Sequence, residues 1–252
     1  KTAGRLNADL DVRMMEAEAK GDAHPFAPAL CVVGATEAGS LLVDLEQLGA
    51  LSIDGSPRAV ADFQRGLLAS TCVAPWAAQC EIVALGIDGL AGDELSRATT
   101  PTAPKERAAQ MASRMRQEAT NLDRSPYEER IDHGIVLHPT IVFIGPDEDF
   151  AGIAHHLAPV ANLAYSPLAI VSAHPLPNEY RIVLEEEAAT LEPFGLTFDP
   201  VSVTSIDMEA IDQLIANGLK HTHFLLQCSF FPQRLSRLRR TDRLVHLLDT
   251  SL

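Results

Sequence analysis

Short apolar runs alternate along the chain with longer amphipathic segments. The apolar runs predict buried strands at residues 29–34, 40–45, 50–55, 80–88, 139–145 and 167–174. Apolar residues at helical spacing, of which Val60, Phe63 and Leu67 are the clearest set, predict helices between these strands. Strands separated by helices are typical of a mostly parallel sheet that is covered on both faces.

The remaining segments complete this pattern. We expect helices over residues 9–21, 57–68, 103–120, 147–161 and 207–219. Residues 179–203 alternate apolar and polar side chains, which predicts a hairpin at one edge of the sheet. The sequence therefore predicts an α/β fold, a three-layer sandwich with a mostly parallel sheet and a mixed edge hairpin. We expect a helix or linker at 1–28, an α/β domain at 29–220 and an arginine-rich segment at 221–252.

Composition narrows the class of protein. Hydrophobic residues make up 46% of the 252 residues and charged residues 21%, which is typical of a folded domain. The net charge of −14 makes the surface of the main body repel phosphate backbones, so we expect no general nucleic-acid binding. Four cysteines without zinc spacing predict reduced thiols in a cytoplasmic protein. No apolar run spans a membrane, so we expect membrane association only through other parts of a longer native chain.

The C-terminal segment differs from the acidic body. It holds five arginines between residues 234 and 243, and on a helix they would lie opposite Leu235, Leu238 and Leu244. One interpretation is a solvated helix or linker that balances the acidic body. The other is a local contact with nucleic acid or an acidic partner. These candidate interaction residues are Arg234, Arg237, Arg239, Arg240 and Arg243.

Residues 51–68 predict a strand, a glycine turn and a helix, which is the frame of a phosphate-binding loop. Ser56 is the expected N-cap, and Pro57 suits the first helical position. Counted from Gly55, however, the positions of the second glycine, the lysine and the magnesium-binding hydroxyl are occupied by other residues. They are Val60, Ala61 and Asp62. The sequence therefore predicts a degenerate, vestigial loop, with Gly55, Ser56 and Arg58 as its remaining candidate phosphate contacts and no cofactor expected.

Other carboxylates and histidines give weaker indications of a metal or catalytic site. Gly145 and Pro146 occupy the end of the apolar strand where a magnesium-binding acid would lie. Asp147 and Glu148 come just after, and their expected role is to cap the next helix. Asp88 follows another strand without a clear partner. The chain has no G-x-S-x-G, H-E-x-x-H or G-x-G-x-x-G motif, and its histidine groupings lack a third ligand at metal spacing. These groupings are His155 with His156 and His221 with His223.

Two resemblances follow from longer phrases. The order of segments resembles that in the motor domains of FtsK-type translocases. These segments are the degenerate loop, the strand EIVALGID, the helix AAQMASRMRQEA and the strand HPTIVFIGPDED. The phrases VDLEQLGALSIDG and LEPFGL are similar to the central domain of large actinobacterial membrane proteins described by their LysM and BTAD domains. This second resemblance covers about residues 30–220. Together they imply a P-loop NTPase-like fold and a membrane-protein context, and they imply no particular reaction.

Three hypotheses for function remain. The first is a noncatalytic P-loop-like domain that acts in assembly or regulation through protein partners, with self-association expected by analogy with motor families. The second is a nucleotide-dependent enzyme in which Arg58 replaces the missing lysine. The third is a regulator that contacts DNA through its basic tail. The sequence favours the first because the phosphate loop lacks the residues that carry its chemistry.

Overall fold

The computed structural model describes residues 27–88, 98–122, 124, 126, 138–186 and 188–208. The predicted helix at 9–21, most of the predicted helix at 207–219 and the arginine-rich segment lie outside these residues. The domain boundaries near residues 28 and 220 therefore stay predictions. Among the described helices, none is both long and apolar enough to cross a bilayer.

Ten strands of the described residues form one sheet in the order β2-β1-β10-β9-β8-β3-β7-β6-β4-β5. Six of them, from β8 to β5, run parallel, and β9, β10, β1 and β2 continue the sheet in antiparallel pairs. The strands are β1 (Leu30–Thr36), β2 (Gly39–Asp44), β3 (Ala50–Asp54), β4 (Glu81–Leu85), β5 (Ala98–Thr99), β6 (Thr140–Ile144), β7 (Leu168–Ser172), β8 (Arg181–Leu184), β9 (Ala189–Glu192) and β10 (Leu196–Pro200).

The predicted late hairpin exists, but the prediction that it forms the sheet edge is wrong. Strands β8, β9 and β10 pair in succession, and β10 then pairs with β1. The edge is instead β2, because the N-terminal hairpin of β1 and β2 adds to the far side of β10. A hairpin signal is local, whereas the strand that covers its outer side comes from a distant part of the chain.

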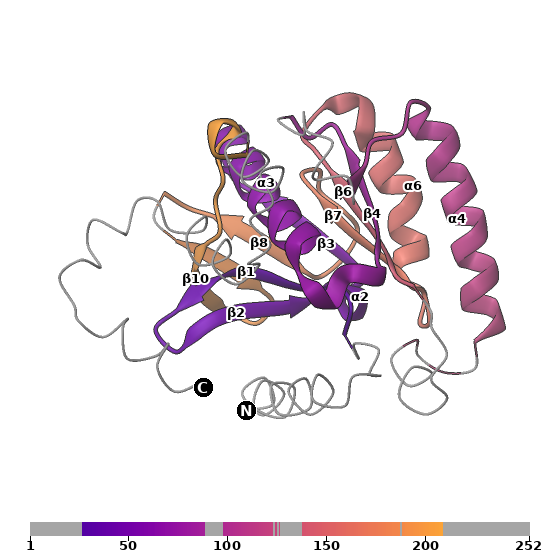
Figure 1. Ribbon diagram of the computed structural model, residues 1–252, viewed down its shortest axis with the longest axis horizontal. Helices are drawn as coiled ribbons and strands as arrows, with labels where there is room; N and C mark the ends of the chain where they lie inside the picture. The colour runs from indigo at the N-terminus through magenta and orange to yellow at the C-terminus, as the bar shows by residue number, and fades with distance from the viewer. Residues whose placement is uncertain are drawn as a thin grey trace.

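Helices cover both faces of the sheet, as Figure 1 shows. Ile141 and Phe143 of β6 pack in one apolar cluster with α3, whereas Val142 and Ile144 pack in a second cluster with α4 and α6. Because side chains alternate between the two faces of a strand, these clusters lie on opposite faces. The predicted three-layer α/β sandwich is therefore confirmed. The helices are α2 (Leu45–Leu48), α3 (Pro57–Val73), η1 (Pro75–Gln79), α4 (Pro104–Asn121), η3 (Glu148–Phe150) and α6 (Ala151–Ala161).

The connections between the parallel strands define the edge where a ligand is expected. The chain leaves β3, crosses one face through α3 to β4, and returns across the other face through α4 and α6 to β7. Strand β3 thus lies between β7 and β8, where the order of the strands reverses. In open α/β sheets, ligands bind outside the carboxyl ends of the strands at such a point. The turn at Gly55 lies at this edge.

Candidate functional site: the turn between β3 and α3

The turn at the carboxyl end of β3 is short and caps its own helix. Strand β3 ends at Asp54 and α3 begins at Pro57, so only Gly55 and Ser56 separate them. The Ser56 hydroxyl accepts a hydrogen bond of 3.3 Å from the Ala59 N–H, and the Ser56 carbonyl accepts one of 3.0 Å from the Val60 N–H. The N-cap and the N-terminal proline expected from the sequence are confirmed.

This geometry leaves little to hold a phosphate. A phosphate loop presents several backbone N–H groups around the anion before its helix begins. Here Pro57 has no N–H group and the Ala59 N–H is taken by Ser56. Arg58 supplies the remaining N–H group of the first turn. The turn therefore occupies the position of a phosphate loop in the sheet but lacks the ring of free backbone N–H groups that would bind the phosphate.

Gly55 has a packing reason to be glycine. Its φ is +153°, and a Cβ added there would lie 2.9 Å from the Cβ of Leu184 and 3.1 Å from its carbonyl oxygen. The turn therefore contacts the end of β8 at a distance that no larger side chain fits. This close packing is a sufficient reason for a glycine at position 55, so no bound ligand is needed to explain it.

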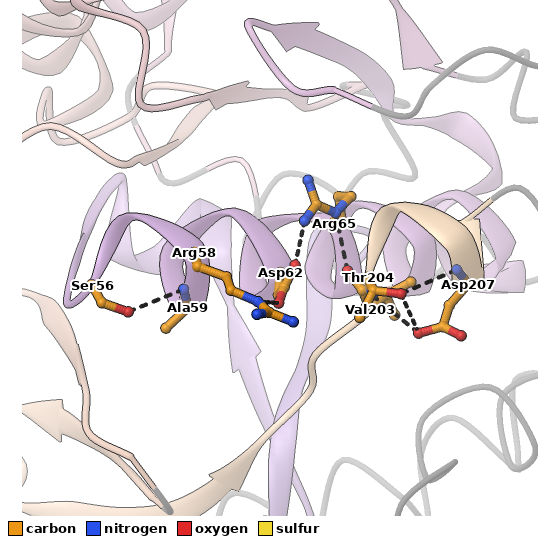
Figure 2. A network of polar contacts seen from close by, with 8 residues as sticks. All are labelled: Ser56, Arg58, Ala59, Asp62, Arg65, Val203, Thr204 and Asp207. Carbon is orange, nitrogen blue, oxygen red and sulfur yellow. Dashed lines mark hydrogen bonds and ion pairs between the residues drawn. The ribbon is translucent and has the colours of Figure 1, made fainter.

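Asp62, at the expected hydroxyl position, is bound into a structural network (Figure 2). Its carboxylate pairs with the guanidinium of Arg65 and lies 3.7 Å from Nε of Arg58. The Asp62 carbonyl accepts a hydrogen bond of 2.9 Å from the Val203 N–H, and Arg65 Nε donates one of 3.0 Å to the Val203 carbonyl. We call residues 201–208, which follow β10 and pack along α3, the strap. Asp62 and Arg65 hold the strap on α3.

Arg58 lies at the start of α3, with its side chain 88% exposed. Its ion-pair contact is with Asp62, one helical turn further along, as Figure 2 shows. The structure thus places Gly55, Ser56 and Arg58 next to one another at the turn. Whether they contact phosphate stays a prediction.

The other predicted carboxylates have local roles. The Asp147 carboxylate accepts a hydrogen bond of 3.0 Å from the Asp149 N–H at the start of η3, which leads into α6. Its carbonyl lies 3.0 Å from Nε2 of the buried His174. The expected capping role of Asp147 is confirmed at η3. Asp88 is exposed and comes directly after β4 and its turn.

A cleft of about 440 Å³ lies beside the turn, and the sequence did not predict it. Its charged lining residues are Asp54, Glu179, Glu192 and Arg181. Arg181 Nη2 donates a hydrogen bond of 2.7 Å to Glu192, and its Nη1 lies 3.9 Å from an Asp54 oxygen. The bond and charge of Glu192 raise the pKa of Arg181. Three carboxylates and one paired guanidinium repel a phosphate group. Sequence spacing could not reveal this cleft because the four residues are scattered over 139 positions, from residue 54 to residue 192.

A second charged cluster lies at the opposite ends of the strands. Glu81 pairs with Arg107 and accepts a hydrogen bond of 2.6 Å from Arg114, both from α4, and one of 3.1 Å from Thr140. Burial acts to raise the pKa of Glu81, but the bond and charge of Arg114, the charge of Arg107 and the Thr140 hydroxyl outweigh burial and lower it. This cluster ties α4 to β4 and β6.

The described residues provide no metal centre, since no group of three or more potential ligands gathers among them. His155 and His156 are exposed on α6, whereas His221 and His223 lie outside the described residues. Cys31, Cys72 and Cys80 are buried. Burial raises the pKa of Cys31, against the smaller opposing effect of its bonds with Thr71 and Ser70. Cys228 and the five arginines of the C-terminal segment lie outside the described residues.

The chain matches no protein-family model and no curated protein. Among solved structures, the pCW3 conjugation coupling protein TcpA, a monomer with ATPγS, is similar at a TM-score of 0.48 and 13% identity, over 75% of this chain and 70% of that chain. The cytoplasmic domain of the Type VII secretion ATPase EccC of Thermomonospora curvata is similar at 0.47 and 10% identity, over 70% of this chain and 26% of that chain. The cytoplasmic domain of EssC is similar at 0.45 and 13% identity, over 71% of this chain and 45% of that chain.

Two of these three structures are described as cytoplasmic domains, and EccC is described as a secretion ATPase. The FtsK-like resemblance and the P-loop NTPase-like assignment of the α/β fold stay expectations from the sequence. The resemblance to LysM- and BTAD-containing actinobacterial membrane proteins has no support among these structures.

Proposed function

We propose that this chain is a noncatalytic P-loop-like domain that acts in assembly or regulation through protein partners. One observation carries the proposal: the turn between β3 and α3 has two residues, and its hydroxyl caps the helix that follows. Phosphoryl transfer depends almost entirely on positioning and charge stabilisation by a lysine, a metal and backbone N–H groups. Ala61 and Asp62 stand where the lysine and the metal-binding hydroxyl are needed, and Asp62 is engaged by Arg65.

The electrostatics of the adjacent cleft support the same proposal. Asp54, Glu179 and Glu192 line the cleft beside the turn, and Arg181 is already paired with Glu192. Bringing a triphosphate close to three carboxylates costs several kcal/mol at an effective dielectric of about 20. A nucleotide would have to recruit Arg58 and displace it from Asp62.

Exposed apolar side chains support a protein partner, including a second copy of the chain. Phe194, in the turn between β9 and β10, is 53% exposed and stacks on Tyr180, with ring centroids 5.9 Å apart. Leu196 beside it is 38% exposed. Aromatic residues in such patches are enriched in protein interfaces. Four cysteines with no C-x-x-C pair and no zinc spacing suit a reducing compartment, so we propose that this role lies in the cytoplasm, within a larger membrane-associated protein.

Thermal unfolding with millimolar Mg-ATP and Mg-GTP tests the noncatalytic role. We expect the same melting temperature with and without nucleotide. A bound nucleotide at 100 times its Kd would stabilise the fold by about 2.7 kcal/mol, which is roughly 5–10 °C for a domain of this size. A shift of that size that Arg58→Ala abolishes, and that the exposed control Arg116→Ala keeps, would establish the noncanonical nucleotide site instead.

Light scattering coupled to size-exclusion chromatography tests self-association. We expect a mass above that of the monomer at micromolar concentration, reduced by Phe194→Glu. Leu163→Glu, at another exposed apolar position, is the matched control. A monomeric mass at all concentrations would refute self-association and leave only other proteins as partners.

A further inference from the structure

Strand β2 forms one edge of the sheet, and no function described above uses its outer side (Figure 1). Among the described residues, β2 pairs with β1 and with no other strand. In an antiparallel pair, alternate residues of each strand turn their N–H and C=O groups away from the partner strand. The outer side of β2 therefore presents main-chain donors and acceptors that can pair with a further strand.

Strand β2 lacks the features by which sheet edges avoid such pairing. Those features are a very short strand, a proline, a charged side chain or a bulge in the edge strand. Residues 39–43 read GSLLV, without a proline or a charge, and Asp44 ends the strand. The register shift in this hairpin falls in β1, between Val32 and Gly34, so β2 itself is regular.

The opposite edge of the sheet is different. Strand β5 has only two residues, which offer little main chain to a partner strand. A second copy of the chain would therefore pair with β2 through its own β2 and not through β5. A contact between two identical strands is isologous and closes at two copies, whereas a contact from β2 to β5 would continue into a filament.

We propose that two copies of this chain pair through their β2 strands, antiparallel and centred on Leu41. The opposed residues are then Leu41 with Leu41, Ser40 with Leu42, and Gly39 with Val43. All of these residues are uncharged, and the two sheets become one continuous sheet across the dimer.

The side chains of β2 match themselves in this register. Leu41 packs against the apolar cluster on the α3 side of the sheet and is half-buried, so its remaining surface can contact the second Leu41. On the other face, Leu42 is half-buried and lies opposite the small, exposed Ser40. Asp44 lies outside the opposed residues, so no carboxylate of β2 faces another, although the chain has a net charge of −14. This match favours a second copy over an unrelated extended segment.

The β2 edge is separate from the apolar patch at Phe194. Strand β1 lies between β2 and β10, and Phe194 lies in the turn before β10. The inference rests on the self-association proposed above and names a second surface for it. If both surfaces bind, copies join alternately through each, and the Phe194→Glu chain should stop at the dimer.

Light scattering of the Phe194→Glu chain isolates the edge contact, because this variant lacks the contact at the apolar patch. We expect a dimer whose dissociation constant falls with added salt, since salt screens the repulsion between two acidic copies. A contact between the arginine-rich segment and an acidic surface would weaken with salt instead.

Opposed charges in β2 test the pairing itself. In the Phe194→Glu background, Ser40→Glu with Leu42→Glu sets like charges opposite each other and should raise the dissociation constant roughly tenfold. Ser40→Lys with Leu42→Lys should do the same. An equal mixture of the two double variants should dimerise again, because opposite charges then face each other. Thr197→Glu, at an exposed position of the inner strand β10, is the control and should leave the mass unchanged.

Hydrogen exchange of the parent chain gives a readout that needs no substitution. The amides of residues 39–43 should exchange more slowly as the protein concentration rises, while those of β6 should not change. Exchange that is slow at every concentration would mean that the same chain covers the edge, and it would overturn the proposal. Protection that requires another added protein would overturn it as well.

The mass measurements separate this inference from the proposed function. A Phe194→Glu chain that is monomeric at every concentration, beside a parent that associates, overturns the edge pairing and leaves the proposed function intact. A mixture of the acidic and basic variants that stays monomeric also overturns the edge pairing. A parent that is monomeric throughout refutes self-association itself.

Discussion

Arg65 and Val203, which are 138 positions apart in the sequence, are joined by a hydrogen bond of 3.0 Å from Nε to the carbonyl oxygen. The same guanidinium pairs with Asp62, whose carbonyl accepts the Val203 N–H. The residue that stands in place of a magnesium-binding hydroxyl therefore helps to hold the strap on α3. Position 62, which would bind magnesium in a phosphate loop, has a structural role in this protein.

We expect Arg65→Met to destabilise the fold by about 1–3 kcal/mol, because it leaves the buried Val203 carbonyl and the Asp62 carboxylate without their donor. Arg65 is only 8% exposed, so water replaces the lost bonds poorly. Urea unfolding monitored by circular dichroism measures the change. The control is Arg58→Met, which removes an 88% exposed side chain and should stay within about 0.5 kcal/mol of the parent. Equal changes in the free energy of unfolding for the two variants would show that the contact between Arg65 and the strap does not stabilise the fold.

A glycine on α3 lets the strap approach. A Cβ on Gly66 would lie 3.0 Å from the Val201 carbonyl oxygen and 3.1 Å from its carbon, so the strap must shift to admit it. We expect Gly66→Ala to cost about 1–3 kcal/mol, although alanine favours helices. Gly152→Ala on α6, where a Cβ would meet nothing within 4 Å, should instead stabilise by up to about 1 kcal/mol. Thermal unfolding of both variants gives the sign of each effect, and stabilisation by Gly66→Ala would contradict the close approach.

Gln64 holds a buried amide of which only one end is bonded. Its Nε2 donates a bond of 2.7 Å to the Ile144 carbonyl, which also accepts the Ala173 N–H, while Oε1 has no partner among the described residues. Gln64→Met removes the unpaired oxygen together with the bond, so we expect a change within about 1 kcal/mol. Gln64→Glu places a charge where Gln64 is fully buried and should cost several kcal/mol at pH 7.

The Gln64→Glu penalty should fall at low pH. Burial raises the pKa of the new carboxyl in the folded state above its value in the unfolded state. The variant is therefore least destabilised below the unfolded value and most destabilised at neutral pH. Urea unfolding of both variants and the parent at pH 7 and near pH 4 measures this difference. A penalty that is the same at both pH values would mean that water reaches the site.

Glu81 makes stability depend on pH in the opposite direction. Its pKa is lowered from 4.5 in the folded protein, so its contribution is complete above that value and is lost as the pH falls through the folded value. We expect Glu81→Gln to cost about 1 kcal/mol at pH 7, or roughly 2–4 °C in Tm, and progressively less below pH 4.5. Glu106→Gln, an exposed change on α4, should follow the parent at every pH. A constant difference between Glu81→Gln and the parent would exclude Glu81 as the titrating group.

Much of the fold could be predicted because its signals are local. The apolar runs that became β3, β4, β6 and β7 and the helical spacing of α3 each lie within a few residues, and the cap at Ser56 is read from two neighbouring positions. The degenerate loop was equally visible, since a phosphate loop is defined by consecutive residues. The role of Asp62 could not be predicted, because its hydrogen-bond partner Val203 is distant in the sequence and lies beside it only because β10 pairs with β1 in the folded sheet.

The sequence by itself determined the alternation of strands and helices and the absence of the lysine and hydroxyl at residues 61 and 62, since both follow from neighbouring residues. The tertiary structure alone decided which strand forms the edge, what the turn at Gly55 packs against, and where acidic residues gather into clefts. Those features involve residues that are distant in the sequence, such as Gly55 and Leu184, or Glu46 and Glu179. These residues lie close together only because β3 pairs with β7 and β8 in the folded sheet. Long-range pairing fixes them, and no local pattern encodes it.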